Sequence, residues 1–337
     1  MNHATESDAC PWREEFLAGL NSAVYFDVSS RDELTLTGRD RHAFLHGFCT
    51  NEIKNLPVGN SCEAFATNIK GKVLAHVFVF AETGRLILDS VPGANEVLVP
   101  HLDRYLITED VQLLPTTQQR RLFFLTGPEV LRMLGRITPT AETLAPGTSR
   151  AISMDNQTVH ARRVDWMKEQ GILLSTEIRG AEGIVQCLQS AGAIPGSPPA
   201  WHALRIRARF PLFGTDFTEE TLAQEVDRTA DAISFRKGCY LGQEPIARID
   251  ALGHVNRLLR SVELRNPDPA MGDFTGAEIV STPDGQKEIG TVTSFAWLPE
   301  EAKPRGVGLA MLRREFSATG QTVYLRLPSG YREANVF

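Results

Sequence analysis

The chain has 337 residues, of which 42% are hydrophobic and 23% charged, and it carries a formal net charge of −6 at pH 7. These values are typical of a globular protein with two or three domains. They argue against a protein that binds nucleic acid directly through a basic face. No stretch of about 18 apolar residues predicts a membrane span. The first residues have the features of neither a secretory signal nor a mitochondrial presequence, so we expect a cytoplasmic protein.

The five cysteines stand far apart in the sequence, at Cys10, Cys49, Cys62, Cys187 and Cys239. No two of them have the CxxC spacing of a zinc or redox site, and their number is odd. In a reducing compartment they are free thiols, and most free cysteines pack as small hydrophobic side chains. We therefore predict no metal site built from this chain alone.

Strand-like and helix-like runs alternate irregularly along the chain, which predicts an α+β fold rather than a doubly wound sheet. In the first part we expect a short helix, a strand, its hairpin partner, a helix that Pro100 kinks or delays, and a closing strand, at residues 43–53, 72–80, 85–89, 97–106 and 110–114. Residues 51–115 are thus predicted to form one compact α+β domain.

The middle of the chain twice repeats a strand followed by a helix. The expected strands are RLFFLTG and GILLST, and the helices that follow them are PEVLRMLG and AEGIVQCLQSAG. Two such pairs predict a split βαβ sheet of the ferredoxin-like kind, to which we assign residues 1–50 and 116–254. A further helix, in WHALRIRARF, ends near Pro211.

Beyond Val255 the pattern changes to short strand-like runs separated by Gly, Pro and Asp: SVELR, AEIVS, EIGTVTSFAWL, GVGLAMLRR and TVYLRL. This rhythm predicts a small antiparallel barrel or sandwich at residues 255–337. We therefore place a domain boundary near residue 254.

The segment RKGCYLGQEPIAR, residues 236–248, concentrates groups that carry chemistry. Two glycines, Gly238 and Gly242, permit a positive φ and a close approach of the backbone. Lys237 precedes Cys239 by two residues, and a nearby ammonium group favours the thiolate over the thiol. A turn that packs a small thiol inward is the structural alternative, which residue type alone leaves equally open. The combination of residues favours a functional segment.

Polar side chains that suit a ligand follow in the same segment. Gln243 offers an amide and Glu244 a carboxylate, and Arg248 is placed to pair with Glu244 if this part is helical. Pro245 fits only the first turn of such a helix. Four other candidates are interpreted as packing residues: His46, His76, Trp166 and Trp201.

K-G-C-Y-x-G-Q-E, at 237–244, resembles the signature of the YgfZ-type folate-binding proteins of iron–sulfur cluster maintenance, relatives of the glycine-cleavage T-protein, an aminomethyltransferase. FLHGFCTNEIKNLPVG, at 44–59, is similar to the family's F-L-Q-G-x-x-T-N-D-[VI]-x-x-L-x-x-G. KGKVLAHVFVF, at 70–80, is similar to its K-G-K motif. Further segments follow in family order: RYLITEDVQL, FLTGP, EIGTVTSFAW and GLAMLRR. The resemblance covers the chain from about Val24 onward.

The resemblance implies a T-protein-like arrangement of three domains around a central opening. A ferredoxin-like domain would be split around an inserted α+β domain, and a C-terminal β-barrel would pack against both. In the transferase relatives this opening binds tetrahydrofolate. The resemblance also implies that Cys239 lies beside the opening and works with Lys237. The residues expected to contact a folate-type ligand are Tyr240, Gln243, Glu244, Arg248, Asn51 and Arg207. For Asn51 the sequence favours a cap or turn that directs the chain towards the opening, with a folate contact as the alternative.

Two departures from the family pattern bear on function. The T-protein contacts the reacting end of folate through an aspartate in G-G-I-x-D-D, whereas this chain reads KGKVLAH at 70–76 and has neither aspartate. This difference argues against aminomethyl transfer. The family also reads L-R-I-E-A-G-x-P, with the glutamate on the pterin ring. Here LRIRARFP places Arg207 at that position, and a guanidinium group only donates hydrogen bonds.

Arg207 leaves three alternatives open for the folate site. Asp216 or Glu244 replaces the missing acceptor, or folate binds differently, or it does not bind. Arg205, Arg207 and Arg209 can also form an anion site for a folate glutamyl tail. For Arg205 we favour a solvated helix residue whose stem covers apolar surface.

The sequence therefore favours an accessory protein of iron–sulfur cluster assembly or repair, in support of tRNA modification, with iron–sulfur enzymes or their assembly proteins as partners. A folate-dependent one-carbon transferase is the first alternative, and a folate-independent scaffold is the second. Cys239 has no second ligand-forming cysteine near it in the sequence, so we do not expect this chain to hold a stable cluster alone.

Overall fold

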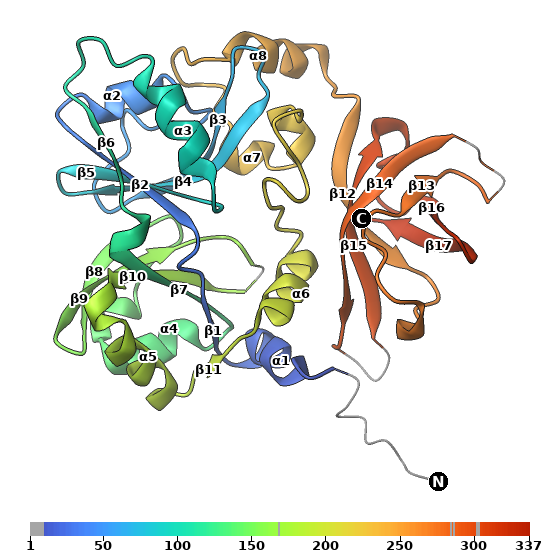
Figure 1. Ribbon diagram of the computed structural model, residues 1–337, viewed down its shortest axis with the longest axis horizontal. Helices are drawn as coiled ribbons and strands as arrows, with labels where there is room; N and C mark the ends of the chain where they lie inside the picture. The colour runs from blue at the N-terminus through green and yellow to red at the C-terminus, as the bar shows by residue number, and fades with distance from the viewer. Residues whose placement is uncertain (1–9, 168, 284, 286, 301–303) are drawn as a thin grey trace.

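Two β-sheets and a closed barrel form the framework of the described part of the chain (Figure 1). The structure, a computed structural model, describes residues 10–167, 169–283, 285, 287–300 and 304–337. The sheets lie on one side of the molecule and the barrel on the other, with helix α6 (Pro198–Ala208) between them (Figure 1). The predicted α+β fold with a C-terminal barrel is confirmed. No helix within the described ranges is long and apolar enough to cross a membrane.

One sheet has five strands in the order β3-β4-β5-β2-β6, and every pair in it is antiparallel. These strands are Ser61–Thr67 (β3), Val73–Glu82 (β4), Arg85–Ser90 (β5), Asp32–Thr37 (β2) and Gln112–Pro115 (β6). Helices α2 (Arg41–His46) and α3 (Ala94–Asp103) bury Leu45 and Leu98 in the core of this sheet. The predicted hairpin at 72–80 and 85–89 is confirmed, and α3 continues through Pro100.

The other sheet has six strands in the order β11-β1-β7-β10-β9-β8. These strands are Ile194–Pro195 (β11), Val24–Asp27 (β1), Arg120–Thr126 (β7), Gly171–Glu177 (β10), Gln157–Arg163 (β9) and Ser149–Met154 (β8). Helices α4 (Val130–Ile137) and α5 (Ala181–Ser190) pack in one core cluster with alternate strand residues. Helices α1 (Arg13–Asn21) and α6 pack in a second cluster, which the barrel shares. Both predicted strand–helix pairs are confirmed.

The C-terminal barrel closes in the order β12-β15-β14-β13-β16-β17. Its strands are Arg257–Leu264 (β12), Glu278–Val280 (β13), Glu288–Leu298 (β14), Arg305–Arg313 (β15), Thr322–Leu327 (β16) and Gly330–Val336 (β17). Alternate apolar residues such as Ile279, Val323 and Leu325 fill its interior. Among the described residues, closure leaves no unpaired strand edge, and the barrel encloses a core cluster of its own.

The segment that leads into the barrel packs on the five-stranded sheet. It contains α7 (Thr229–Ala232) and α8 (Gln243–Leu252). One core cluster joins it to Phe65 of β3 and Val73 of β4. Strand β2 also lies in this sheet, where it pairs with β5. The change of sheet therefore falls before residue 32 rather than at the boundary expected after residue 50, and residues 217–246 contact the strands of 61–115.

Buried ion pairs connect the two sheets. Arg162 of β9 donates from Nη1 to Oε2 of Glu33 at 2.9 Å and from Nη2 to Oε1 of Glu82 at 3.0 Å. All three side chains are buried, and the arginine has no exposed surface. A buried guanidinium is tolerated here because two carboxylates from β2 and β4 compensate its charge. This arrangement fixes the orientation of one sheet against the other.

Candidate functional site

Lys237 is buried and holds the loop that follows α2. Its Nζ donates to the carbonyl oxygens of His46 at 2.6 Å, Cys49 at 2.5 Å and Asn51 at 3.0 Å. The ammonium group also lies 4.7 Å from the centre of the Tyr240 ring. Burial lowers the pKa of Lys237 to about 8. All three N–H groups are directed at carbonyls, so the ammonium has none left to donate to a sulfur atom.

Cys239 stands between these anchored residues and is exposed. Lys237 and Tyr240 on either side of it are buried. The alternative in which the thiol of Cys239 packs inward is therefore wrong. The role of Cys239 as the reacting group, with Lys237 as its activator, stays a prediction, and the contacts of Lys237 give that residue a positioning role.

Gly242 lets the backbone of this segment lie directly against β3. Its φ is +85°, and a Cβ atom there would lie 2.3 Å from the carbonyl oxygen of Asn68. Beside it, the Leu241 carbonyl accepts from the Thr67 hydroxyl at 2.7 Å, and the Leu241 N–H donates to Gly47 at 2.9 Å. Only glycine combines this φ with so close a contact. The positive φ and close backbone approach predicted for Gly242 are thus both present in the structure.

Helix α8 begins at Gln243 and carries the three polar candidates of the segment. Gln243 is half-buried, whereas Glu244 and Arg248 are exposed. In the part of the chain that the structure describes, no ion pair joins Glu244 to Arg248. Pro245 lies in the first turn, and the helix continues for ten residues in all. As ligand contacts these three residues remain predictions.

Asn51, interpreted as a capping or turn residue with a folate contact as the alternative, connects two elements. Its side-chain nitrogen donates to the carbonyl oxygens of Glu63 at 2.8 Å and Asp231 at 2.9 Å. Its side-chain oxygen accepts from the N–H of Glu52 at 2.8 Å. Both amide N–H groups are thus used, and the residue ties the loop after α2 to β3 and α7.

Arg207 is held by two carboxylates. Its Nε donates to Glu300 Oε1 at 2.6 Å and its Nη1 to Glu169 Oε1 at 2.8 Å. Glu300 belongs to the chain between β14 and β15 and also accepts from Arg305 at 3.0 Å. Arg207 therefore connects α6 to the barrel side of the molecule, and its charge is already compensated.

The interpretation of Arg205 as a solvated residue is wrong. Arg205 is fully buried and donates to Asp216 Oδ2 at 2.7 Å and to the Ser294 hydroxyl at 2.7 Å. Asp216 is itself almost inaccessible, and its other oxygen accepts from Thr293 at 2.8 Å and Ser294 at 2.6 Å. The barrel supplies these hydroxyl partners, which is why helix periodicity did not reveal them. Both oxygens of Asp216 are occupied, so it is not a free acceptor for a pterin.

A buried cluster of Glu63, His76 and Arg228 was missed by the sequence analysis. Glu63 Oε1 lies 2.8 Å from His76 Nε2 and accepts from Arg228 Nε at 2.8 Å. Burial opposes ionisation of Glu63, but hydrogen bonds from Arg228 and the charge of His76 outweigh it and lower the pKa of Glu63 to about 2. Strand alternation was the available signal, because Glu63 shares a face of β3 with Phe65 and Thr67.

Aromatic rings surround this cluster. His76 packs against Phe65, Phe78, Phe210 and Phe217. Trp166 stacks between Phe124 and Phe210, at centroid distances of 4.9 and 5.8 Å, and Arg31 lies 4.2 Å from its ring centre. Its indole Nε1 is buried and has no hydrogen-bond partner among the described residues. The predicted packing role of Trp166 is confirmed.

These groups differ in what they can do chemically. Glu63 and His76 are only 8% and 4% exposed and share a hydrogen bond, so they belong to the packed interior rather than to a surface that a partner molecule can reach. Cys239 is the exposed nucleophilic group of the segment, and its neighbours fix its backbone. The chemistry available to a partner molecule is therefore that of a presented thiol.

The fold is that of an aminomethyltransferase. The chain superposes on the crystal structure of glycine cleavage system aminomethyltransferase T from Bartonella henselae with a TM-score of 0.85, at 19% sequence identity, covering 96% of this chain and 87% of that one. At this identity the likeness shows the fold alone. A family model described as the GCVT N-terminal domain matches residues 5–232. The chain therefore belongs to the GCVT N-terminal domain family.

Relatives at low identity include proteins named aminomethyltransferase, such as one from Thermus thermophilus that is 28% identical over 210 residues, covering 62% of this chain and 60% of that one. The chain is 26% identical over 307 residues to "Putative transferase At1g60990, chloroplastic" of Arabidopsis thaliana, covering 90% of this chain and 68% of the relative. It is 25% identical over 228 residues to "tRNA-modifying protein YgfZ" of Klebsiella pneumoniae, covering 67% of each. The resemblance inferred from the motifs is thereby confirmed at the level of the family.

Proposed function

We propose that this protein is an accessory protein of iron–sulfur cluster assembly or repair, of the folate-binding type, that acts through the thiol of Cys239. The observation that carries the proposal is the exposed sulfur between two buried anchors, Lys237 and Tyr240. A client protein can reach such a thiol without unfolding the segment. The name of the Klebsiella relative connects that protein with tRNA modification. We propose the same connection here, through a client iron–sulfur enzyme in the cytoplasm.

A single thiol suits a transient step. Stable clusters are held by several protein ligands, usually four cysteines. Cys239 can contribute one sulfur ligand or exchange thiols with the client, and the client supplies the remaining groups. The partner is thus an iron–sulfur enzyme or an assembly protein that brings its own ligands.

The test in cells is Cys239→Ser. The substitution removes one exposed sulfur atom, so the midpoint of thermal unfolding should stay unchanged. Activity of iron–sulfur enzymes should fall in cells that carry the variant, most under oxidative stress. Cys187→Ser, on helix α5, is the matched control and should leave these activities at the wild-type level. Wild-type activity with Cys239→Ser would sink the assignment.

At Arg207 the residues present do not fit a pterin edge. The pterin needs an acceptor, and Arg207 offers only donors that already bind Glu169 and Glu300. Asp216 is occupied as well, and Glu244 is exposed on α8. We therefore expect the wild-type protein to bind tetrahydrofolate weakly.

Tetrahydrofolate binding is measured by anaerobic calorimetry. Arg207→Glu alone would place three carboxylates together, so the informative variant is Arg207→Glu with Glu169→Gln, in which Arg305 still compensates Glu300. We expect tighter binding by this double variant than by the wild type or by Glu169→Gln alone. Equal affinity in all three would show that the pterin uses another acceptor.

Aminomethyl transfer is not part of the proposal. The transferase aspartates are replaced, and His76 in that stretch binds Glu63, whose charge Arg228 compensates. No free carboxylate is therefore supplied to the reacting amine by these three residues. Turnover of an aminomethyl donor by the purified protein would revive the transferase alternative.

A further inference from the structure

A polar pocket of about 460 Å³ lies between the two sheets. It is distinct from the segment around Cys239. Its lining consists of Glu33, Thr35, Arg85, Thr116, Gln119, Arg120, Glu177, Ile178 and Arg179. Its volume falls in the range of small-molecule sites in proteins. The lining is unusual for such a site because three of the nine residues are arginines.

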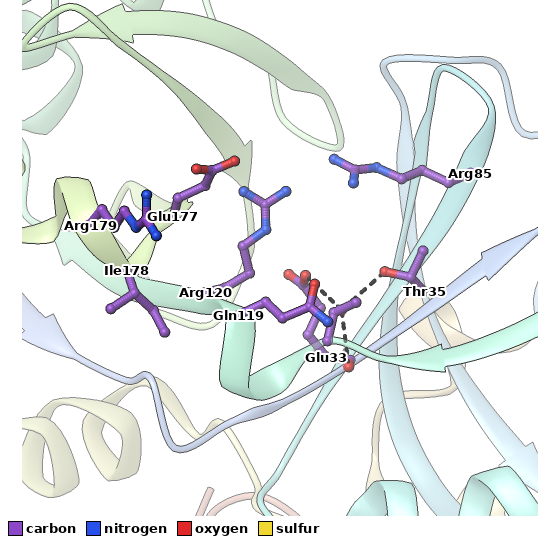
Figure 2. A pocket seen from close by; sticks show the side chains of 9 residues that line it. Glu33, Thr35, Arg85, Gln119, Arg120, Glu177, Ile178 and Arg179 are labelled. Atoms are coloured by element: carbon purple, nitrogen blue, oxygen red, sulfur yellow. Dashed lines mark hydrogen bonds between the residues drawn. The ribbon is translucent and has the colours of Figure 1, made fainter.

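The three arginines come from different elements and meet at the pocket. Arg120 begins β7, Arg85 begins β5, and Arg179 lies in the 3₁₀ turn Ile178–Gly180 after β10. Figure 2 shows the guanidinium group of Arg120 in the middle of the pocket, with that of Arg85 facing it from the other sheet and Arg179 on the opposite wall. Cationic groups therefore approach one space from more than one side.

Two carboxylates at or beside the pocket are already paired with arginines. Glu33 is 1% exposed; its Oε2 accepts from Arg162 at 2.9 Å and its Oε1 from the Thr116 hydroxyl at 3.2 Å. Glu82 accepts from Nε and Nη2 of Arg85 at 2.8 and 2.6 Å. Arg162 and Arg85 thus compensate these two carboxylates, and they do not repel an anion.

The charged side chains of the pocket that have no partner carry a net positive charge. Within the described part of the chain, neither Arg120 nor Arg179 has an ion pair or a hydrogen bond from its side chain, and Nη1 of Arg85 has no partner. Glu177 is the one lining carboxylate without a partner there. Two uncompensated arginines against one carboxylate leave a net charge of about +1 at the pocket, which favours an anionic ligand.

We propose that this pocket binds the phosphate group of a small phosphorylated molecule. Guanidinium groups on opposite walls match a tetrahedral anion, which presents acceptors on all sides, better than a planar carboxylate with two oxygens. The pocket is larger than one phosphate group. Hydroxyl and amide groups of Thr35 and Gln119 on its wall suit a hydroxylated body, as in a sugar phosphate.

The test is calorimetric titration of the full chain with ribose 5-phosphate, in chloride buffer at constant ionic strength. We expect saturable binding by the wild type, and Arg120→Gln or Arg179→Gln should weaken it about tenfold or more, because each removes charge-assisted hydrogen bonds. Glu177→Gln should tighten binding, because it removes the carboxylate that opposes the anion. Absence of binding to the wild type at millimolar ligand would overturn the proposal.

Arg121→Gln is the matched control. Arg121 follows Arg120 in β7, is exposed, and lies 3.9 Å from Asp27 rather than in the pocket. Equal weakening by Arg121→Gln would show that binding follows surface charge, which would also overturn the proposal. Succinate is the carboxylate probe and inorganic phosphate the probe without an organic body. Affinity for succinate equal to that for ribose 5-phosphate would refute the phosphate assignment, and equal affinity for inorganic phosphate would refute the hydroxylated body.

Discussion

The carboxylate of Glu63 offers a direct test of the buried charges, and we expect Glu63→Gln to destabilise the protein more at pH 7 than at pH 3.5. In the folded protein the pKa of Glu63 is about 2, against an ordinary value of 4.5. A tenfold change in proton affinity corresponds to ~1.4 kcal/mol. The ionised carboxylate therefore contributes about 3 kcal/mol to the free energy of unfolding at neutral pH.

The pH dependence follows from the direction of this change. Because the folded-state pKa is depressed, the contribution is complete above pH 4.5 and is lost as the pH falls towards 2. At pH 3.5 the unfolded chain has bound the proton and the folded protein has not, so about 1.4 kcal/mol is lost. Glutamine has nearly the same size and no charge. The difference between wild type and variant should therefore shrink by this amount.

Urea unfolding of both proteins at the two pH values measures this difference. Glu244→Gln is the control, because Glu244 is exposed on α8 and has no ion pair within the described residues. We expect it to change the free energy of unfolding by less than about 0.5 kcal/mol at either pH. A loss for Glu63→Gln that is the same at pH 7 and pH 3.5 would refute the reasoning, because it would mean that Glu63 titrates alike in both states.

Two further predictions concern the segment around Cys239. Gly242→Ala should cost more stability than Gly253→Ala although their φ angles are +85° and +86°, because a Cβ atom at 242 meets the Asn68 carbonyl at 2.3 Å and one at 253 meets nothing within 4 Å. We expect about 1 kcal/mol for Gly253→Ala and at least about twice that for Gly242→Ala in urea unfolding, and equal losses would contradict the close contact. Lys237→Met leaves three carbonyls without their donor and should cost about 2 kcal/mol or more, whereas Met at the exposed Lys70 should cost almost nothing. A stable Lys237→Met protein would show that water replaces the ammonium group.

The elements that sequence reasoning found are those whose signal is local. The barrel was predicted because short runs such as TVYLRL and EIGTVTSFAWL alternate between turn residues, and each run is a strand of the structure. The hairpin of β4 and β5 was likewise found from its strands and from the turn at Gly84. Sheet membership was harder. β2 is a short strand whose partner, β5, lies some 50 residues further on, and no local pattern reveals that pairing.

The same limit explains the errors in the site. Arg205 lies on a predicted helix, where an arginine commonly covers apolar surface with its stem and keeps its charge in water, so a solvated arginine was the natural interpretation. Its partners Asp216 and Ser294 lie on two other segments. Lys237 was predicted to act on the thiol of Cys239, which stays a prediction, and its carbonyl partners lie about 190 residues earlier in the chain. Spacing in the sequence associated it with Cys239, whereas packing directs it to the loop after α2.

Arg207 stands where the family pattern has a glutamate, and its role depends on what its guanidinium group contacts. The sequence reveals that a donor stands where relatives have an acceptor, and on this evidence alone an anion site was as consistent as a lost folate contact. The structure argues against an anion site at Arg207, because Glu169 and Glu300 already bind its guanidinium group. Because two carboxylates from separate segments bind Arg207, this residue forms a contact between α6 and the barrel side. Arg207 therefore holds the contact between α6 and the barrel side, whereas Arg120 and Arg179 in the pocket between the sheets have no carboxylate partner among the described residues.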